Sequence, residues 1–280
     1  MKTQIRTLNH RSRVLRMSGA LCSIIFMWAL CSNLASAATV IYSDNFTHAA
    51  GALNGNTVQT SSGTDGGTLN ATWTANTNFT YSGAGLLNSV GSASAYYYAN
   101  LALTPVTGKV YTLTVDMDPA NGASGSIFLA AGFASSNATS NTSFSGRNPW
   151  VAYATNGTGK AYSSGTTQYG TTFGTAGSVS NPIRLTLTLN TTTALWSTSY
   201  SVLDLTTSTI LGTGSNTYTT NPTITSVYVG NVGIQPTNST FDNFQLSVVP
   251  EPSAFALFGI GLLVLSWQAR ARRMRSGWVG

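Results

Sequence analysis

The sequence predicts an all-β protein whose body, residues 38–249, is a single β-sandwich flanked by two terminal sorting segments. Three observations support this prediction. Runs of alternating apolar and polar residues, typical of strands with one buried face, recur along the body. Clusters of Gly and Asn, which tolerate the positive φ of tight turns, separate these runs. No segment of the body shows the apolar period of about 3.6 residues that indicates an amphipathic helix.

The N-terminal segment, residues 1–37, has the three parts of a secretory signal peptide. A basic stretch comes first, and an uncharged apolar run of 11 residues follows from Ala20 to Leu30. Ala35 and Ala37 then form an A-x-A pattern, which predicts cleavage before Ala38. A permanent membrane helix is the alternative. We disfavour it because the run would rise only about 17 Å, against roughly 30 Å for a bilayer core.

The clearest predicted strand of the body spans residues 183–190, in which four aliphatic residues alternate with four polar ones. Further strands are predicted at 111–117, 127–133, 150–154, 196–202, 223–229 and 241–248. Many short strands separated by turn signals favour a sandwich or a barrel. Cys22 and Cys31, the two cysteines of the chain, both belong to the predicted signal peptide. The body must therefore fold by burial alone, without disulfides or cysteine-based metal sites.

Two segments at the ends of the body echo each other, with the sequences SDNF at 43–46 and FDNF at 241–244. Together with GALNG at 51–55 and Trp73, they resemble the opening and closing of concanavalin-A-like lectin and glucanase domains. The resemblance implies a jelly-roll sandwich in which the first and last strands lie in the same sheet. A repeat array would also explain the echo, but no period of about 20–50 residues supports it.

The C-terminal segment, residues 250–275, has three parts in a fixed order. It begins with the motif Pro250, Glu251 and Pro252. An uncharged apolar run at 254–267 follows, which as a helix would rise about 21 Å and span a membrane only marginally. It ends with the basic tail Arg270, Arg272, Arg273 and Arg275. The positive-inside rule keeps this tail cytoplasmic and the body outside, and an ordinary tail anchor is the alternative.

This tripartite end resembles the PEP-CTERM sorting signal of Gram-negative bacteria. The resemblance implies a partner, the membrane peptidase exosortase, that recognises and cleaves the segment. It further implies a link to exopolysaccharide and biofilm production, with the body at the cell surface or in the extracellular matrix. The charges agree, because the net +6 belongs to the two ends while the body holds four basic residues and six Asp. A basic face for nucleic acid is therefore not expected.

The body offers little catalytic chemistry. It contains no Glu, and His48 is its single histidine. It also lacks a G-x-S-x-G elbow and the glycine patterns that bind phosphates. Glycoside hydrolysis generally needs two carboxylates, and Asp116 and Asp118 share a strand face but are expected to end that strand. A secreted carbohydrate-active enzyme using Asp alone is the alternative to a non-enzymatic protein, and a purely structural coat component is the third reading.

Weak binding of extracellular polysaccharide is the predicted activity of the body. Exposed aromatic rings are expected to form a shallow platform for sugar rings, whose apolar faces stack on them. The candidates are Tyr96, Tyr97, Tyr98 and Trp150. Core packing is the alternative for each ring. No cofactor is required, although Asp44 and Asp242 are candidate ligands for Ca²⁺, with turn formation as the alternative.

Overall fold

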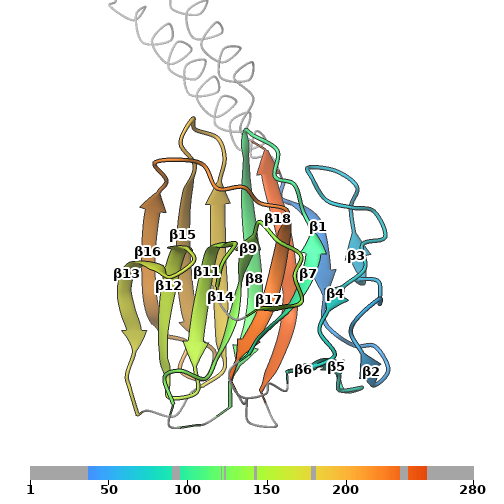
Figure 1. Ribbon diagram of the computed structural model, residues 1–280, viewed down its shortest axis with the longest axis vertical. Helices are drawn as coiled ribbons and strands as arrows, with labels where there is room; N and C mark the ends of the chain where they lie inside the picture. The colour runs from blue at the N-terminus through green and yellow to red at the C-terminus, as the bar shows by residue number, and fades with distance from the viewer. Residues whose placement is uncertain are drawn as a thin grey trace, which may run out of the picture. The chain divides into compact units, whose positions relative to one another are not determined.

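The computed structural model describes residues 37–250, except 90–94, 121, 123, 142–143, 178–180 and 234–238. Most of the predicted signal peptide, with Ala35, and the sorting segment from Glu251 onward lie outside the described residues. All regular structure within them is β-strand, in two antiparallel sheets packed face to face (Figure 1). No helix in this part of the chain has the length and apolarity to cross a membrane. The predicted all-β sandwich is confirmed.

Sheet I is the larger sheet, and its main path ends at the strand Ile210–Thr217. In spatial order, this path consists of β16 (Ile210–Thr217), β15 (Ser197–Asp204), β14 (Ile183–Asn190), β8 (Lys109–Asp118), β18 (Thr240–Pro250), β6 (Leu87–Ser89), β5 (Phe79–Tyr81) and β2 (Gly51–Ala52). Two more strands join it beside β18: β1 (Thr39–Asp44) pairs with β18, and β3 (Thr60–Ser61) pairs with β1. The central strands β14, β8 and β18 form long ladders, and the one between β8 and β18 has a register shift between Asp242 and Gln245.

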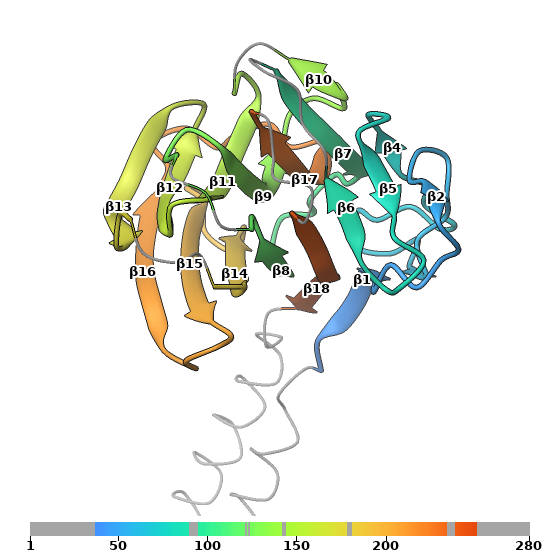
Figure 2. The ribbon, with the colours of Figure 1, turned by 90° about the horizontal axis from the view of Figure 1, so that it is seen from below.

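Sheet II lies against sheet I, as the view along the strands shows (Figure 2). Its path consists of β10 (Ser140–Asn141), β7 (Tyr96–Ala102), β17 (Ser226–Val232), β9 (Phe128–Ala134), β11 (Arg147–Ala154), β12 (Thr158–Ser164) and β13 (Thr167–Gly174). A short strand, β4 (Thr74–Ala75), pairs with β7. Each sheet thus has one face toward the shared core and one outer face, and the outer faces are where a ligand can approach.

Strand β14 shows how the sequence pattern produces the core. Its residues alternate between buried and half-buried along the whole strand, as predicted. The four aliphatic side chains are 0% exposed: Ile183, Leu185, Leu187 and Leu189. They lie in register with the inward residues of β8 and β15, so one continuous apolar layer faces sheet II. Burial of these apolar side chains is the main stabilising term in a body without thiols.

The echoing segments at the two ends of the body are neighbours in the structure. Strands β1 and β18 pair antiparallel, with Asp44 opposite Phe244. Trp73 packs edge-on against Phe244, with 5.1 Å between ring centroids, and donates its indole N–H to Asp44 Oδ2 at 2.9 Å. The expectation that the first and last strands share a sheet is therefore correct.

Several strands were not predicted, among them β12, β13 and β16. In β16, glycines stand where apolar side chains would reveal the alternation. A Cβ on Gly212 would lie 2.5 Å from Phe173, and a Cβ on Gly214 would lie 2.7 Å from Tyr200. These two rings fill the space that the glycines leave, and Leu211 is the residue of β16 that packs against the core, so the strand contributes to the core without an alternating apolar pattern. A pattern search along one strand cannot detect this arrangement.

Substitutions at two neighbouring positions of β14 should have very different effects on stability. Leu187→Ala removes a fully buried side chain and should lower the free energy of unfolding by about 2–5 kcal/mol. Thr186→Ala changes a half-buried residue of the outer face and should cost no more than about 0.5 kcal/mol. Urea unfolding of both variants measures the difference. Equal losses at the two positions would contradict the assignment of faces.

Candidate functional site

Trp150, one of the predicted sugar-binding residues, is buried on the outer face of sheet II. Its ring stacks between Phe144 and Tyr162, each with 4.1 Å between centroids and planes within 15°. Its indole N–H donates to the Gly165 carbonyl oxygen at 2.8 Å, and only 1% of the residue is exposed. The prediction that Trp150 is exposed is wrong, because other aromatic rings already cover both of its faces.

Tyr98 is also buried, beneath the guanidinium group of Arg147. The guanidinium carbon lies 3.4 Å from the centroid of Tyr98 and 4.5 Å from that of Tyr228. Arg147 donates hydrogen bonds to Asn100 Oδ1 and to the Ala138 carbonyl oxygen, both at 3.1 Å. Burial raises the pKa of Tyr98 to about 12. Tyr98 therefore makes a cation–π contact with Arg147. Through its hydrogen bond to Ala138, Arg147 also holds the segment between β9 and β11 against sheet II.

Tyr96 and Tyr97 are both half-buried and point to opposite faces of β7, as the strand alternation requires. Tyr97 packs against the core between the sheets. Tyr96 lies on the outer face, edge-on to Phe144 with 4.5 Å between centroids. Of the four predicted platform residues, Tyr96 is thus the one that stays partly exposed on the outer face of sheet II. The sequence missed this because the covering residue, Phe144, comes from a segment with no strand pattern.

Asp44, a candidate calcium ligand, has both carboxylate oxygens engaged inside the protein. Oδ1 accepts the Phe46 N–H and Oδ2 accepts the Trp73 N–H, each at 2.9 Å. Burial raises the pKa of Asp44 although these hydrogen bonds act in the opposite direction. Among the described residues, no three His, Asp or Glu side chains converge as metal ligands. A calcium site at Asp44 or Asp242 stays a prediction.

Two further carboxylates of sheet I, Asp116 and Asp242, lie beside Arg184 near the end of β8. Arg184 donates to both oxygens of Asp116, at 2.7 and 2.8 Å, and Asn243 Nδ2 donates to Asp116 Oδ2 at 2.9 Å. Burial raises the pKa of Asp242, which lies opposite Asp116 on β18. With three N–H donors on it, Asp116 is held as a structural anion rather than as a free general base.

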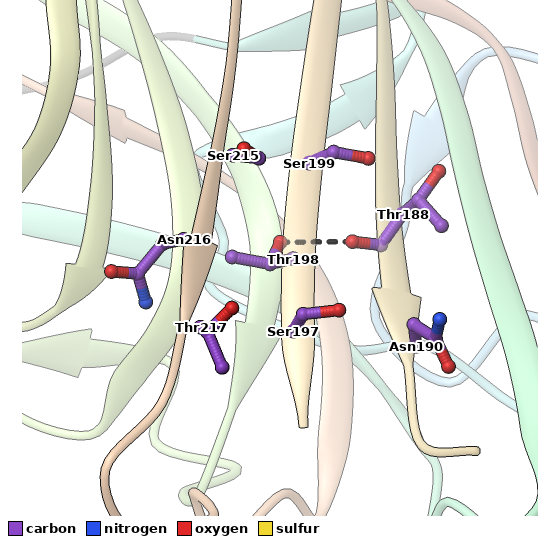
Figure 3. Close-up of a pocket in the computed structure, with 8 residues that line it drawn as sticks. All are labelled: Thr188, Asn190, Ser197, Thr198, Ser199, Ser215, Asn216 and Thr217. Carbon is purple, nitrogen blue, oxygen red and sulfur yellow. Dashed lines mark hydrogen bonds between the residues drawn. The ribbon is translucent and has the colours of Figure 1, made fainter. Parts of the chain in front are cut away.

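A hollow of about 250 Å³ lies over three adjacent strands of sheet I (Figure 3). Its lining consists of Thr188, Asn190, Ser197, Thr198, Ser199, Ser215, Asn216 and Thr217. Strands β14, β15 and β16 bring these residues together, because Thr188, Ser199 and Ser215 are paired across them. Thr198 is held below by a 2.8 Å hydrogen bond to the Thr188 carbonyl oxygen.

Every side chain around this hollow is a hydroxyl or an amide. Such groups donate and accept hydrogen bonds, so they suit an uncharged polar ligand. None of them titrates near neutral pH, and no histidine or carboxylate stands among them to activate a nucleophile. The sequence contained a signal for this site that we did not use, namely the uncharged polar half of the strand alternation.

The fold and the hollow define a β-sandwich body with an uncharged polar hollow on the outer face of sheet I. The chain carries a PEP-CTERM protein-sorting motif at residues 248–273, which marks it as an exported protein processed by exosortase at the membrane. The match includes Pro250, Glu251 and Pro252 and three of the four tail arginines. The predicted sorting motif is confirmed. No curated protein matches the chain in sequence.

Solved structures similar to the chain include lectins and a glucanase, each with a TM-score under 0.5. An endo-1,3-β-glucanase from Streptomyces sioyaensis has a TM-score of 0.46 and 11% identity, covering 76% of this chain and 97% of its own. Lectin II from Ulex europaeus has a TM-score of 0.44 and 11% identity, and the match covers 64% of this chain and 92% of the lectin. Arcelin-5, a lectin-like defense protein from Phaseolus vulgaris, has a TM-score of 0.42 and 8% identity, and the match covers 73% of this chain and 100% of arcelin-5. None of them lends a residue role to this chain.

Replacing Asp118 by Asn should stabilise the protein at neutral pH. Burial raises the pKa of Asp118, so the folded state disfavours the charged form and the free energy of unfolding falls as pH rises through that pKa. Asn keeps an oxygen to accept the Ala120 N–H, which lies 2.9 Å from Asp118 Oδ1. Thermal unfolding should show a higher Tm for Asp118→Asn at pH 7 and a smaller advantage near pH 3, where Asp118 is neutral in both states. An equal advantage at both pH values would contradict the electrostatic cause.

Proposed function

We propose that the body is a non-enzymatic exported protein that binds extracellular polysaccharide through the hollow on sheet I. The observation that carries this proposal is the composition of its lining, which consists of hydroxyl and amide side chains only. A neutral sugar presents the same groups, hydroxyls that both donate and accept. The sorting motif supports a location at the surface or in the matrix of a Gram-negative cell, where polysaccharide is abundant.

Binding at one such site should be weak. A net hydrogen bond between neutral groups contributes about 0.5–1.5 kcal/mol, and no exposed aromatic face adds stacking in the hollow. A few such bonds correspond to a Kd of roughly 0.1–1 mM. Many copies on a surface or in a matrix would convert this weak contact into stable adhesion by multivalency.

The structure of the carboxylate cluster supports a non-enzymatic role over the Asp-dependent enzyme. Hydrolysis of a glycosidic bond needs one carboxylic acid and one carboxylate free to act on substrate and water. Asp116 is instead bound by Arg184 and Asn243, and none of these residues lines the hollow. A purely structural coat component is the outcome if no glycan binds.

Removing one hydroxyl of the hollow should weaken polysaccharide binding. Ser199→Ala, at an exposed position of β15, should lower the affinity for polysaccharide of the producing cells about fivefold. Ser164→Ala is the matched control, since Ser164 is exposed on β12 in the other sheet. Calorimetric titration measures both, and assay of reducing ends tests hydrolysis. Absence of binding by the wild type, or release of reducing ends, would refute the proposal.

The second test of the proposed function concerns processing. We expect the exported protein to begin near Ala38 and to lose its C-terminus near Pro250–Pro252, because the A-x-A pattern and the sorting motif are the two cleavage signals. Intact-mass measurement on protein from the producing cells determines both ends. A mass that retains the tail from Arg270 to Arg275 at steady state would show that exosortase does not process the chain.

A further inference from the structure

The outer face of sheet I carries two unbroken rows of uncharged polar side chains, and three residues of the first row line the hollow. The first row crosses five strands through Ser247, Thr112, Thr188, Ser199 and Ser215, which are paired in this order. The second row runs beside it through Gln245, Thr114, Thr186, Ser201 and Thr213. We call these two rows the hydroxyl array. The hollow occupies only its part over β14, β15 and β16.

Every member of the hydroxyl array is at least partly exposed. Within the described part of the chain, the side chains of the array form one hydrogen bond to the protein, from Ser247 Oγ to the Thr112 carbonyl oxygen at 3.5 Å. The backbone groups beneath them are paired in the sheet ladders. The side-chain hydroxyls are therefore the groups of this face that can bind something outside the protein.

The array is also free of charge, which selects the kind of ligand. Exposed strand positions in soluble proteins are commonly occupied by charged residues. Here the first charges along the strands come beyond the second row, where Arg184 and Asp116 neutralise each other. An anionic polymer would find no unpaired cation on the array. A neutral polymer rich in hydroxyls matches its chemistry.

The spacing of the array favours a long ligand. Neighbouring strands lie about 4.8 Å apart, so one row of five positions extends about 19 Å, and the two rows lie about 6.7 Å apart. A sugar unit of an extended chain is comparable in length to one strand spacing, so a monosaccharide reaches only one or two positions of a row. Because each neutral hydrogen bond contributes little, only a ligand that contacts many positions gains useful affinity.

We propose that the hydroxyl array binds an internal, extended stretch of a neutral polysaccharide lying across β18, β8, β14, β15 and β16. This inference rests on the proposed function and adds the ligand class and its orientation. The hollow accommodates one part of the chain, and the remaining positions extend the contact along both rows. The outer face of sheet II is a poorer candidate, because Phe144 covers the ring of Trp150 and Arg147 covers the ring of Tyr98.

The test compares ligand length and uses variants outside the hollow. The neutral polysaccharide of the producing cells is cut into fragments of graded length, and each is titrated into the protein purified from those cells. Affinity should rise at least about tenfold from disaccharide to the fragment that spans a row, and then level off. An acidic polysaccharide of the same length should bind no more tightly.

The double variant Thr114→Val and Thr186→Val removes two hydroxyls of the second row. Thr114 and Thr186 are half-buried strand residues and valine suits such positions, so the fold should persist with an unchanged unfolding midpoint. Binding of the longest fragments should weaken about fivefold for each hydroxyl removed, while the disaccharide is unaffected. Thr172→Val on β13, an exposed position of sheet II, is the matched control.

The outcomes separate this inference from the proposed function. Length-dependent binding that the double variant weakens supports the array. Binding that is independent of length, or that Ser199→Ala weakens while the double variant does not, overturns the array and leaves the hollow as the site. Tighter binding of the acidic polymer overturns the neutral ligand class. Failure of every fragment to bind refutes both. A dimer in sedimentation analysis that the double variant dissociates would also refute both, because a second copy would then occupy this face.

Discussion

The structure depends on burial of the apolar half of each strand between two sheets. The body has no thiol and few charges, so neither disulfides nor ion-pair networks can replace this term. The in-register pairing of β8, β14 and β15 places every second residue inside, and a shift of one residue would expose the whole aliphatic layer. The same register therefore decides which residues the outer face presents.

The two outer faces use this constraint differently. On sheet II the outward residues are partly aromatic, and they form a second apolar cluster under the segment that Arg147 fastens. A buried guanidinium is costly unless its donors find acceptors. Here the two terminal nitrogens of Arg147 donate to an amide and to carbonyl oxygens, and two tyrosine faces cover the group, while Nε has no hydrogen-bond partner among the described residues. Over the hydroxyl array of sheet I the outward residues are polar and uncharged, so this part of the face stays open to water. The surface available for recognition is thus the one without aromatic rings.

The sorting motif and the chemistry of sheet I lead toward the same role. The exported body carries hydroxyl and amide groups around its hollow, and such groups suit the many weak contacts of the proposed function. The carboxylates of the body serve the fold: Asp44 holds Trp73 at the junction of the first and last strands, and Asp116 joins β8 to β14 through Arg184. The raised pKa of Asp44 and the ion pair of Asp116 with Arg184 reflect these structural positions.

The sequence by itself determined the sorting segment, the fold class and the central strands, because each depends on local order: a tripartite end, or alternation over eight residues as in β14. It also placed the two echoing segments in one sheet. Only the tertiary structure decided which aromatic rings are covered, since Phe144, which belongs to no strand, covers Trp150, and Arg147, at the start of β11, covers Tyr98. It likewise decided where the hydroxyls meet. Ser and Thr are common throughout the chain, and a row across five strands forms only when segments more than one hundred residues apart adopt a matching register.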